Sequence, residues 1–334
     1  MDKDYLADRF GGCLLGMAMG DAMGAPADGL PAFLVAKRFQ QVDGFFGPSS
    51  KIGRYGFAAS LALTLGAHVV EEGGLCPAAV VRAHLAAMPR LPPPWPDVVS
   101  QLNGKRLEEC GCQASMEAWS ALKMVPVGLW ASLRGLEDAD LLRACRLACR
   151  PTHPGRACAV AGFVVAKVIK DCVRLGPDLN QTGELYYQPK SLLSRLVDAC
   201  DAAESVMSPE ERREDRMSWR LCHARSALQG EFCRTRLRRP MMLAEFAGMH
   251  GHSRDVHDAV GFSLFCFMRQ PDDWAATVDA ASMGGLASVN AALVGAMSGA
   301  FHGLSLLPKD TRDALENSGK ILGLAERMAA MPQG

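Results

Sequence analysis

The sequence carries no excess of charge of either sign, since 36 lysines and arginines balance 36 aspartates and glutamates over 334 residues. A protein that binds nucleic acid normally concentrates positive charge, because neutralising phosphates supplies most of its sequence-independent affinity. A disordered chain combines high net charge with few apolar residues, whereas 49% of this chain is hydrophobic. The composition therefore predicts a globular protein with no nucleic-acid partner.

Paired cysteine motifs are also missing. The chain has 12 cysteines, but none form the C-x-x-C pairs typical of zinc or thioredoxin-like sites. The first ten residues are rich in aspartate and lack the basic-then-apolar order of a signal peptide. We therefore expect free, mostly buried thiols, no disulfide and a cytoplasmic location.

Charged residues are absent between Asp279 and Lys309, and this run is long enough to span a bilayer. Glycine, serine, asparagine and histidine interrupt its apolarity, and no second such run accompanies it. A helix buried on all sides in a protein core explains this pattern better than a membrane span does. We therefore expect no membrane partner.

Alternating strand patterns bounded by hairpin turns are scarce, and helical spacing of apolar residues dominates. The sequence predicts an all-α fold forming a single domain over residues 1–334. The segments with apolar residues three and four apart are 58–70, 78–87, 141–149, 157–173, 192–205, 256–268, 291–306 and 311–330. A proline-rich loop at 89–96 and a polar loop at 176–189 interrupt them.

Aromatic residues make up only 7% of the chain, while glycine occurs 33 times. Two segments repeat small residues at every fourth position, which places them along one ridge of a helix. Each glycine costs a helix about 1 kcal/mol relative to alanine, so the repeats indicate close backbone contact, and we expect the two helices to pack together in the core. The small residues are Gly12, Gly16, Gly20 and Gly24, and Ala287, Ala291, Gly295, Gly299 and Gly303.

Four segments, in order along nearly the whole chain, resemble motifs of one family. Residues 20–28, Gly-Asp-Ala-Met-Gly-Ala-Pro-Ala-Asp, are similar to the N-terminal signature of the ADP-ribosylglycohydrolase family. The others are 123–129, with Lys123 where an arginine is common, Thr152-His153 at a helix start, and 284–303. The resemblance implies an all-α domain with an active cleft where these helices meet.

The resemblance also identifies what this sequence lacks. Active members bind two magnesium ions through a Thr-Asp-Asp run after a tyrosine and an Asp-Thr-Asp-Thr run after a double glycine. Here Gly-Phe-Ala follows Tyr55, and Leu-Ala-Ser-Val follows Gly285. Magnesium requires oxygen ligands, normally including carboxylates, and a binuclear site needs anionic charge. We therefore expect no metal and no cofactor.

The resemblance further suggests which residues surround the cleft. Asp28 aligns with the family's acidic residue near the scissile bond, and the alternative is that it caps the turn after Pro26. His153 could exchange protons with a ligand, or hold a loop by a hydrogen bond. We predict Asp28 and His153 as catalytic residues. The predicted ligand-binding residues are Tyr55, Phe57, Lys123, Leu286, Ser288 and Val289.

Other polar groups are predicted to be structural. Asp21 lies within the glycine repeat, where a charge must be paired, so a buried hydrogen-bonding role is favoured. His250, His252 and His257 lie near Asp255 and Asp258, but their spacing matches no zinc pattern and indicates a loop leading into a helix.

Three functions remain open. In the first, an apolar, metal-free cleft binds a small organic molecule or transforms it by acid–base catalysis (an elimination, isomerisation or cyclisation), because the residues replacing the metal ligands form a coherent apolar surface. In the second, an inactive relative acts as a binding or regulatory protein. Its docking face would be the arginine-rich segment 212–239, although such charge runs are usually solvated helix faces. In the third, residual ADP-ribosyl hydrolysis persists through Asp28 and water.

Overall fold

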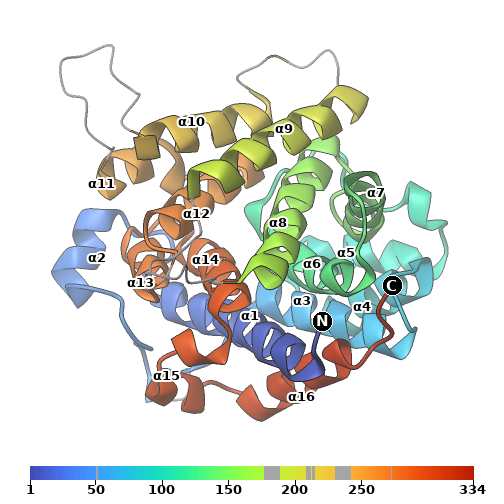
Figure 1. Cartoon of the computed structure of the whole chain (residues 1–334), viewed down its shortest axis with the longest axis horizontal. Coiled ribbons are helices and arrows are strands. Elements are labelled where there is room, and N and C mark those ends of the chain that lie inside the picture. Colours follow the sequence, from blue (N-terminus) through green and yellow to red (C-terminus); the bar gives the residue numbers. More distant parts are fainter. Residues whose placement is uncertain (50–51, 177–188, 208–211, 213–214, 230–241, 272) are drawn as a thin grey trace.

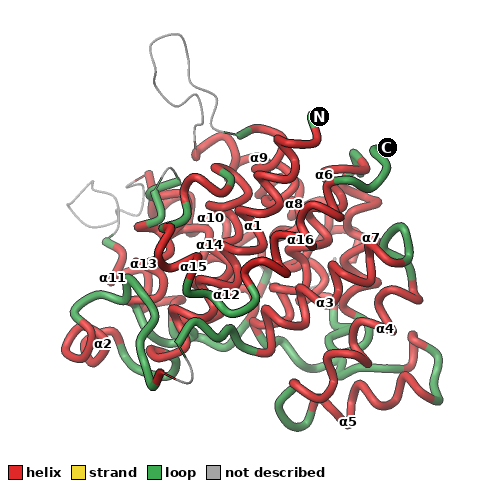
Figure 2. Tube along the Cα trace, turned by 90° about the horizontal axis from the view of Figure 1, so that it is seen from below, coloured by secondary structure: helices red, strands yellow, loops and turns green. Residues whose placement is uncertain are grey.

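The computed structural model of the chain describes residues 1–49, 52–176, 189–207, 212, 215–229, 242–271 and 273–334. All the regular secondary structure in these residues is helical. The only β-type contacts among them are two isolated bridges, Pro31 with Gly284 and Glu117 with Asp255. The all-α prediction is therefore confirmed. Figure 2 shows the helices packed against one another with loops at the periphery.

The centre of the fold is a close pair of helices, α1 (Lys3–Gly24) and α14 (Ala287–His302) (Figure 1). A Cβ atom added at Gly16 would lie 2.2 Å from the carbonyl oxygen of Gly295, and one added at Gly12 would lie 2.5 Å from that of Gly299. Such distances leave no room for a side chain. The two small-residue ridges thus pack on each other, as their spacing predicts.

Other helices enclose this pair on several sides. α8 (Arg156–Leu175) packs against α14, α6 (Met124–Arg134) and α7 (Asp138–Cys149), while α16 (Ser318–Ala329) packs against α1. α3 (Phe57–Glu71) contacts α1, α4 (Pro77–Ala87) and α6. The remaining helices are α2 (Ala32–Phe39), α5 (Trp95–Ser100), α9 (Pro189–Met207), α10 (Met217–Gln229), α11 (Leu243–Phe246), α12 (Val256–Arg269), α13 (Ala275–Ser282) and α15 (Lys309–Asp313).

Helix boundaries near the C-terminus differ from the predicted ones. α14 begins at Ala287 and ends at His302, because Gly303 has φ 80° and turns the chain away. The helix predicted over 311–330 is two helices, α15 and α16, which are separated at Asn317 by a left-handed residue with φ 59°. Apolar periodicity continues across such breaks, so it does not reveal them.

The proline-rich segment is more ordered than a loop. α5 begins within it at Trp95 and has Pro96 as its second residue, and a proline in the first turn of a helix loses no hydrogen bond. α5 is followed by the 3₁₀ turns Gln101–Asn103 and Leu107–Glu109. The sequence prediction missed α5 because prolines both start and interrupt helices.

The thiols and the long uncharged run behave as buried structure. All eleven cysteines in the described residues are free, and most are buried. The run from 279 to 309 forms the end of α13 and all of α14, whose residues are almost entirely buried. Among the described helices, none is sufficiently long and apolar to cross a membrane.

Candidate functional site

Asp28 lies just after the end of α1, where the short 3₁₀ turn Ala25–Ala27 redirects the chain towards α14. Its carboxylate accepts hydrogen bonds from the backbone N–H of Ser288, at 2.8 Å, and from the Ser288 hydroxyl, at 2.7 Å. Ser288 is in the first turn of α14, where backbone N–H groups have no partner within the helix. Asp28 therefore caps α14 instead of the turn after Pro26.

Two backbone hydrogen bonds hold Asp28 in this position. The N–H of Gly29 donates to the carbonyl of Gly285 at 2.7 Å, and the N–H of Gly285 donates to the carbonyl of Leu30 at 2.9 Å. The Asp28 side chain nevertheless remains exposed. Desolvation by the surrounding chain raises the pKa of Asp28, while the hydrogen bonds from Ser288 oppose this shift. Asp28 is therefore an accessible carboxyl group that is fixed in orientation.

Asp21 has a parallel role at the start of α3. It is buried and accepts a hydrogen bond from the N–H of Ala59 at 3.3 Å, and Gly56 also donates to it. A Cβ atom at Gly56 would lie 3.0 Å from an Asp21 oxygen, so glycine allows the close approach. Burial raises the pKa of Asp21 to about 7 despite these hydrogen bonds. The predicted role of Asp21 as a buried hydrogen-bond partner is confirmed.

The residues at this site do not fit the binuclear magnesium centre that the resemblance implies. The carboxylates of Asp21 and Asp28 are already bound to backbone N–H groups at the starts of α3 and α14. The helix starts themselves supply Phe57, Ala58 and Leu286, which carry no oxygen ligand. Within the described ranges, no group of three or more carboxylate, histidine or cysteine side chains is placed to hold a metal.

Tyr55 and Arg90 lie beside the start of α3. Desolvation raises the pKa of the Tyr55 hydroxyl, which hydrogen-bonds with Asn317. The guanidinium of Arg90 lies 5.9 Å from the centre of the Tyr55 ring and donates to the Ser60 hydroxyl at 2.9 Å. Arg90 ends the 3₁₀ turn Met88–Arg90 and belongs to no motif, so it could not be predicted from the sequence.

The predicted apolar residues lie at the starts of the same two helices. Phe57 and Leu286 are partly buried, and Val289 is 8% exposed. The Phe57 ring packs edge-on against Trp119, with 5.4 Å between ring centres. Phe57 and Leu286 therefore retain some accessible apolar surface near the two carboxylates, whereas Val289 mainly packs in the core.

His153 lies in the protein interior. Its ring stacks on Trp95 at 4.4 Å and meets Trp119 edge-on at 4.6 Å, and its side chain has no exposed surface. Neither ring nitrogen has a hydrogen-bond partner among the described residues. Burial, followed by the charge of Lys123, lowers the pKa of His153 to about 2. The structure thus places His153 away from solvent, as a neutral imidazole, and does not bring it together with exposed Asp28.

Lys123 is also buried, with no exposed surface. Its ammonium group donates to the hydroxyl of Thr152 at 2.7 Å and to the carbonyl of Ala148 at 3.2 Å. No carboxylate in the described residues forms an ion pair with it. Burial lowers the pKa of Lys123. In this conformation Lys123 ties the end of α7 to the Thr152-His153 segment, and it does not face a ligand from solvent.

The burial of Lys123 gives a testable prediction for stability. Lys123→Ala should lower the free energy of unfolding by about 2–4 kcal/mol, because it leaves a cavity and an unpaired Thr152 hydroxyl. Lys123→Met keeps most of the volume and removes a buried charge, so its loss should be about 1 kcal/mol. Urea unfolding at pH 7 measures both values. Equal losses in the two variants would contradict this assignment.

The histidine cluster forms a hydrogen-bonded chain between α10, α12 and residues 247–251. His250 bonds through Nδ1 to Asp258 at 2.9 Å and through Nε2 to Nδ1 of His223 at 2.6 Å. Arg220 pairs with the same Asp258 carboxylate at 2.8 Å. His257 instead contacts the carbonyl of Asp215. The cluster therefore has a structural role, as expected, but His250 lies in the π-helical turn Ala247–Gly251 and not in the loop that the sequence indicated before α12.

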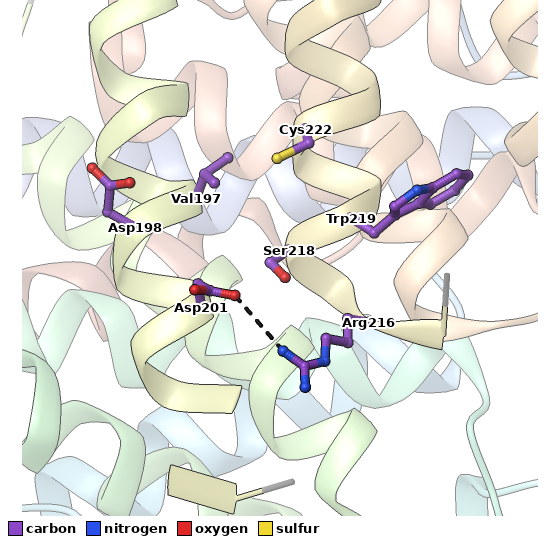
Figure 3. Close-up of a pocket in the computed structure, with 7 residues that line it drawn as sticks. All are labelled: Val197, Asp198, Asp201, Arg216, Ser218, Trp219 and Cys222. Carbon is purple, nitrogen blue, oxygen red and sulfur yellow. Dashed lines mark ion pairs between the residues drawn. The ribbon is translucent and has the colours of Figure 1, made fainter. Parts of the chain in front are cut away.

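A pocket of about 500 Å³ lies between α9 and α10 (Figure 3). It is lined by Val197, Asp198, Asp201, Arg216, Ser218, Trp219 and Cys222. Arg216 pairs with Asp201 across it at 3.9 Å. None of the predicted site residues lines this pocket. Only part of the arginine-rich segment 212–239 is described by the structure, since 213–214 and 230–239 lie outside the described residues.

The fold and the two capped helix starts define the class of protein. It is an all-α protein built on a close glycine-rich helix pair, with carboxylates from the end of one helix fixed at the starts of two others. The chain belongs to the ADP-ribosylglycohydrolase family, whose sequence model matches residues 1–334.

One solved structure shares this fold over almost its whole length. It is described as an ADP-ribosylglycohydrolase-related protein complex, and it is 21% identical to this chain with a TM-score of 0.69. The match covers 98% of this chain and 99% of the other. At this identity the similarity shows the fold alone. No curated protein matches the sequence.

Proposed function

We propose that this protein binds a small organic molecule beside Asp28 and acts on it by metal-independent acid–base chemistry. The observation that carries the proposal is the state of Asp28, which is exposed while Ser288 fixes both carboxylate oxygens. Partly exposed Phe57 and Leu286 offer apolar surface at the adjoining helix starts. Together these features provide an oriented polar group with apolar neighbours, as small-molecule sites do.

The chemistry would rest on proton transfer by Asp28. A carboxyl group with a raised pKa retains its proton closer to neutral pH and can donate it to a leaving group or accept one from carbon. Asp21 is close enough for its charge to interact with that of Asp28, but it is buried and bound to the start of α3. It therefore cannot position a water molecule as the second carboxyl of a glycosidase does. An elimination, isomerisation or cyclisation needs only one such group, in a cytoplasmic enzyme without a cofactor.

The alternative is a catalytically inactive protein that acts by binding. Its support is that the similar solved structure is described as a protein complex, and that both carboxylates at the site have structural roles as helix caps. In that case, the pocket between α9 and α10 and the described part of the arginine-rich segment would belong to the partner surface.

Asp28→Asn is the direct test of the catalytic proposal. Native mass spectrometry of the purified full chain should reveal a bound small molecule that survives EDTA treatment, and Asp28→Asn should reduce its occupancy or turnover at least tenfold. Asparagine retains one oxygen to accept the bond from the Ser288 N–H, and its amide N–H can donate to the Ser288 hydroxyl, so the helix cap should be largely preserved. Asp43→Asn, at an exposed position outside the site, is the control. Unchanged occupancy and turnover in Asp28→Asn would reject the proposal.

Calorimetry with ADP-ribose separates the remaining hypothesis of residual hydrolysis. We expect no measurable binding with or without added magnesium, because the helix starts lack the carboxylates that would hold the metal. Binding that increases with magnesium would instead support a retained hydrolase site and contradict the metal-independent proposal.

A further inference from the structure

We infer that Arg90 recognises an anionic group, a carboxylate or a phosphate, on the ligand bound at this site. The inference rests on the proposed function and narrows the ligand to an organic anion with an apolar body. It begins from a difference among the three charged groups near the starts of α3 and α14. Asp21 and Asp28 accept hydrogen bonds from helix N–H groups, whereas no carboxylate in the described residues pairs with Arg90.

Arg90 is held in place although it is exposed. Its Nη1 donates to the hydroxyl of Ser60, a residue of the first turn of α3 that is only 7% exposed. The guanidinium also lies beside the Tyr55 ring, and its charge acts on both Tyr55 and Asp21. A long side chain on a surface turn thus reaches across to the start of α3, where Asp21 of α1 accepts its hydrogen bonds.

The remaining donors of Arg90 define the kind of ligand. A guanidinium has five N–H groups in a rigid plane, and the bonds to the hydroxyls of Ser60 and Tyr55 leave three of them for a further acceptor. A pair of these N–H groups matches two oxygens of a carboxylate or phosphate. Phe57 lies in the same first turn of α3 as Ser60, and Leu286 directly precedes α14, so both partly buried side chains offer apolar surface at the helix starts that hold Arg90 and Asp28.

The test measures binding of two small anions, acetate and inorganic phosphate, to the full chain by calorimetry at constant ionic strength. Arg90→Gln should lower the affinity for the better-bound anion at least tenfold. Ser60→Ala should lower this affinity a few-fold, because Arg90 would then lose the hydrogen bond that holds it in place. The control is Arg82→Gln, which removes an exposed arginine of α4 that pairs with Glu72. Its affinity should stay within about twofold of the wild type.

The outcomes separate this inference from the proposed function. Anion binding that is lost in Arg90→Gln but kept in Asp28→Asn supports the inference even if Asp28 has no chemical role. A co-purifying molecule that is lost from Asp28→Asn but kept by Arg90→Gln upholds the proposed function and overturns the inference. Equal anion binding in wild type and Arg90→Gln, equal losses in Arg82→Gln, or no binding of either anion would also overturn it. Preference for acetate or phosphate identifies the anionic group.

Discussion

Gly16→Ala is expected to lower the free energy of unfolding by about 3 kcal/mol or more. The added methyl group would lie 2.2 Å from the carbonyl oxygen of Gly295, and the obstacle is backbone in a central helix. α1 and α14 would have to separate along the whole ridge, because Gly12 and Gly20 are in similar contact with α14. The measurement is equilibrium urea unfolding followed by far-ultraviolet circular dichroism.

Two other glycines serve as matched controls. Gly11 is on the same helix, but its added Cβ would meet only the end of the Leu304 side chain at 3.2 Å. Gly323 is in α16, where the nearest atom would be an Arg327 nitrogen at 3.6 Å. Gly11→Ala should cost less than about 1 kcal/mol, and Gly323→Ala should stabilise the protein by about 0.5–1 kcal/mol through helix propensity. If Gly16→Ala and Gly11→Ala had equal free energies of unfolding, the packing argument would be refuted.

The central helix pair could be predicted from sequence because its signal is local and repeated. Glycine or alanine at every fourth residue defines a ridge whatever surrounds it, and two such ridges in one chain can satisfy each other. The boundaries at Gly303 and Asn317 could not be predicted in the same way. They depend on single backbone conformations, with φ 80° and 59°, inside segments whose apolar spacing continues.

The candidate site was predicted only in part, for a related reason. Motif spacing pointed to Asp28 and Ser288 separately, but their hydrogen bonds depend on a loop of α1 meeting the start of α14, 260 residues away. His153 is buried against Trp95 and Trp119, and Lys123 is buried in the core. Their burial could not be predicted, because the residues that cover them come from distant segments of the chain. Arg90 lies in a proline-rich stretch without periodicity, so no pattern indicated it.

His84 of α4 and His153, which both have no exposed surface, should make the protein sensitive to acid. Burial lowers the pKa of His84 to about 3 and that of His153 to about 2, whereas an unfolded histidine titrates near 6.5. Below about pH 6.5 the unfolded chain binds protons that the folded chain cannot, so each histidine costs about 1.4 kcal/mol of stability per pH unit. His84→Leu and His153→Leu should each gain about 2 kcal/mol relative to wild type between pH 6.5 and pH 5.

Asp21 should make the protein less stable as the pH rises, which is the opposite of the effect of the two histidines. This difference in sign is an internal check on the histidine prediction. Its pKa is raised to about 7 in the folded protein, against about 3.9 in an unfolded chain. The stability that protonated Asp21 contributes is therefore fully present below about pH 3.9 and is lost as the pH rises through about 7. Asp21→Asn should remove that loss, so its stability relative to wild type should increase from pH 5 to pH 7 by about 2 kcal/mol.

Urea unfolding at pH 5, 6 and 7 on all four proteins measures both slopes of stability against pH. Parallel curves for wild type and variants would mean that these groups titrate alike in the folded and unfolded states. Opposite slopes would show that the histidines next to Lys123 are held neutral by burial, while the carboxyl group at the start of α3 retains its proton near neutral pH.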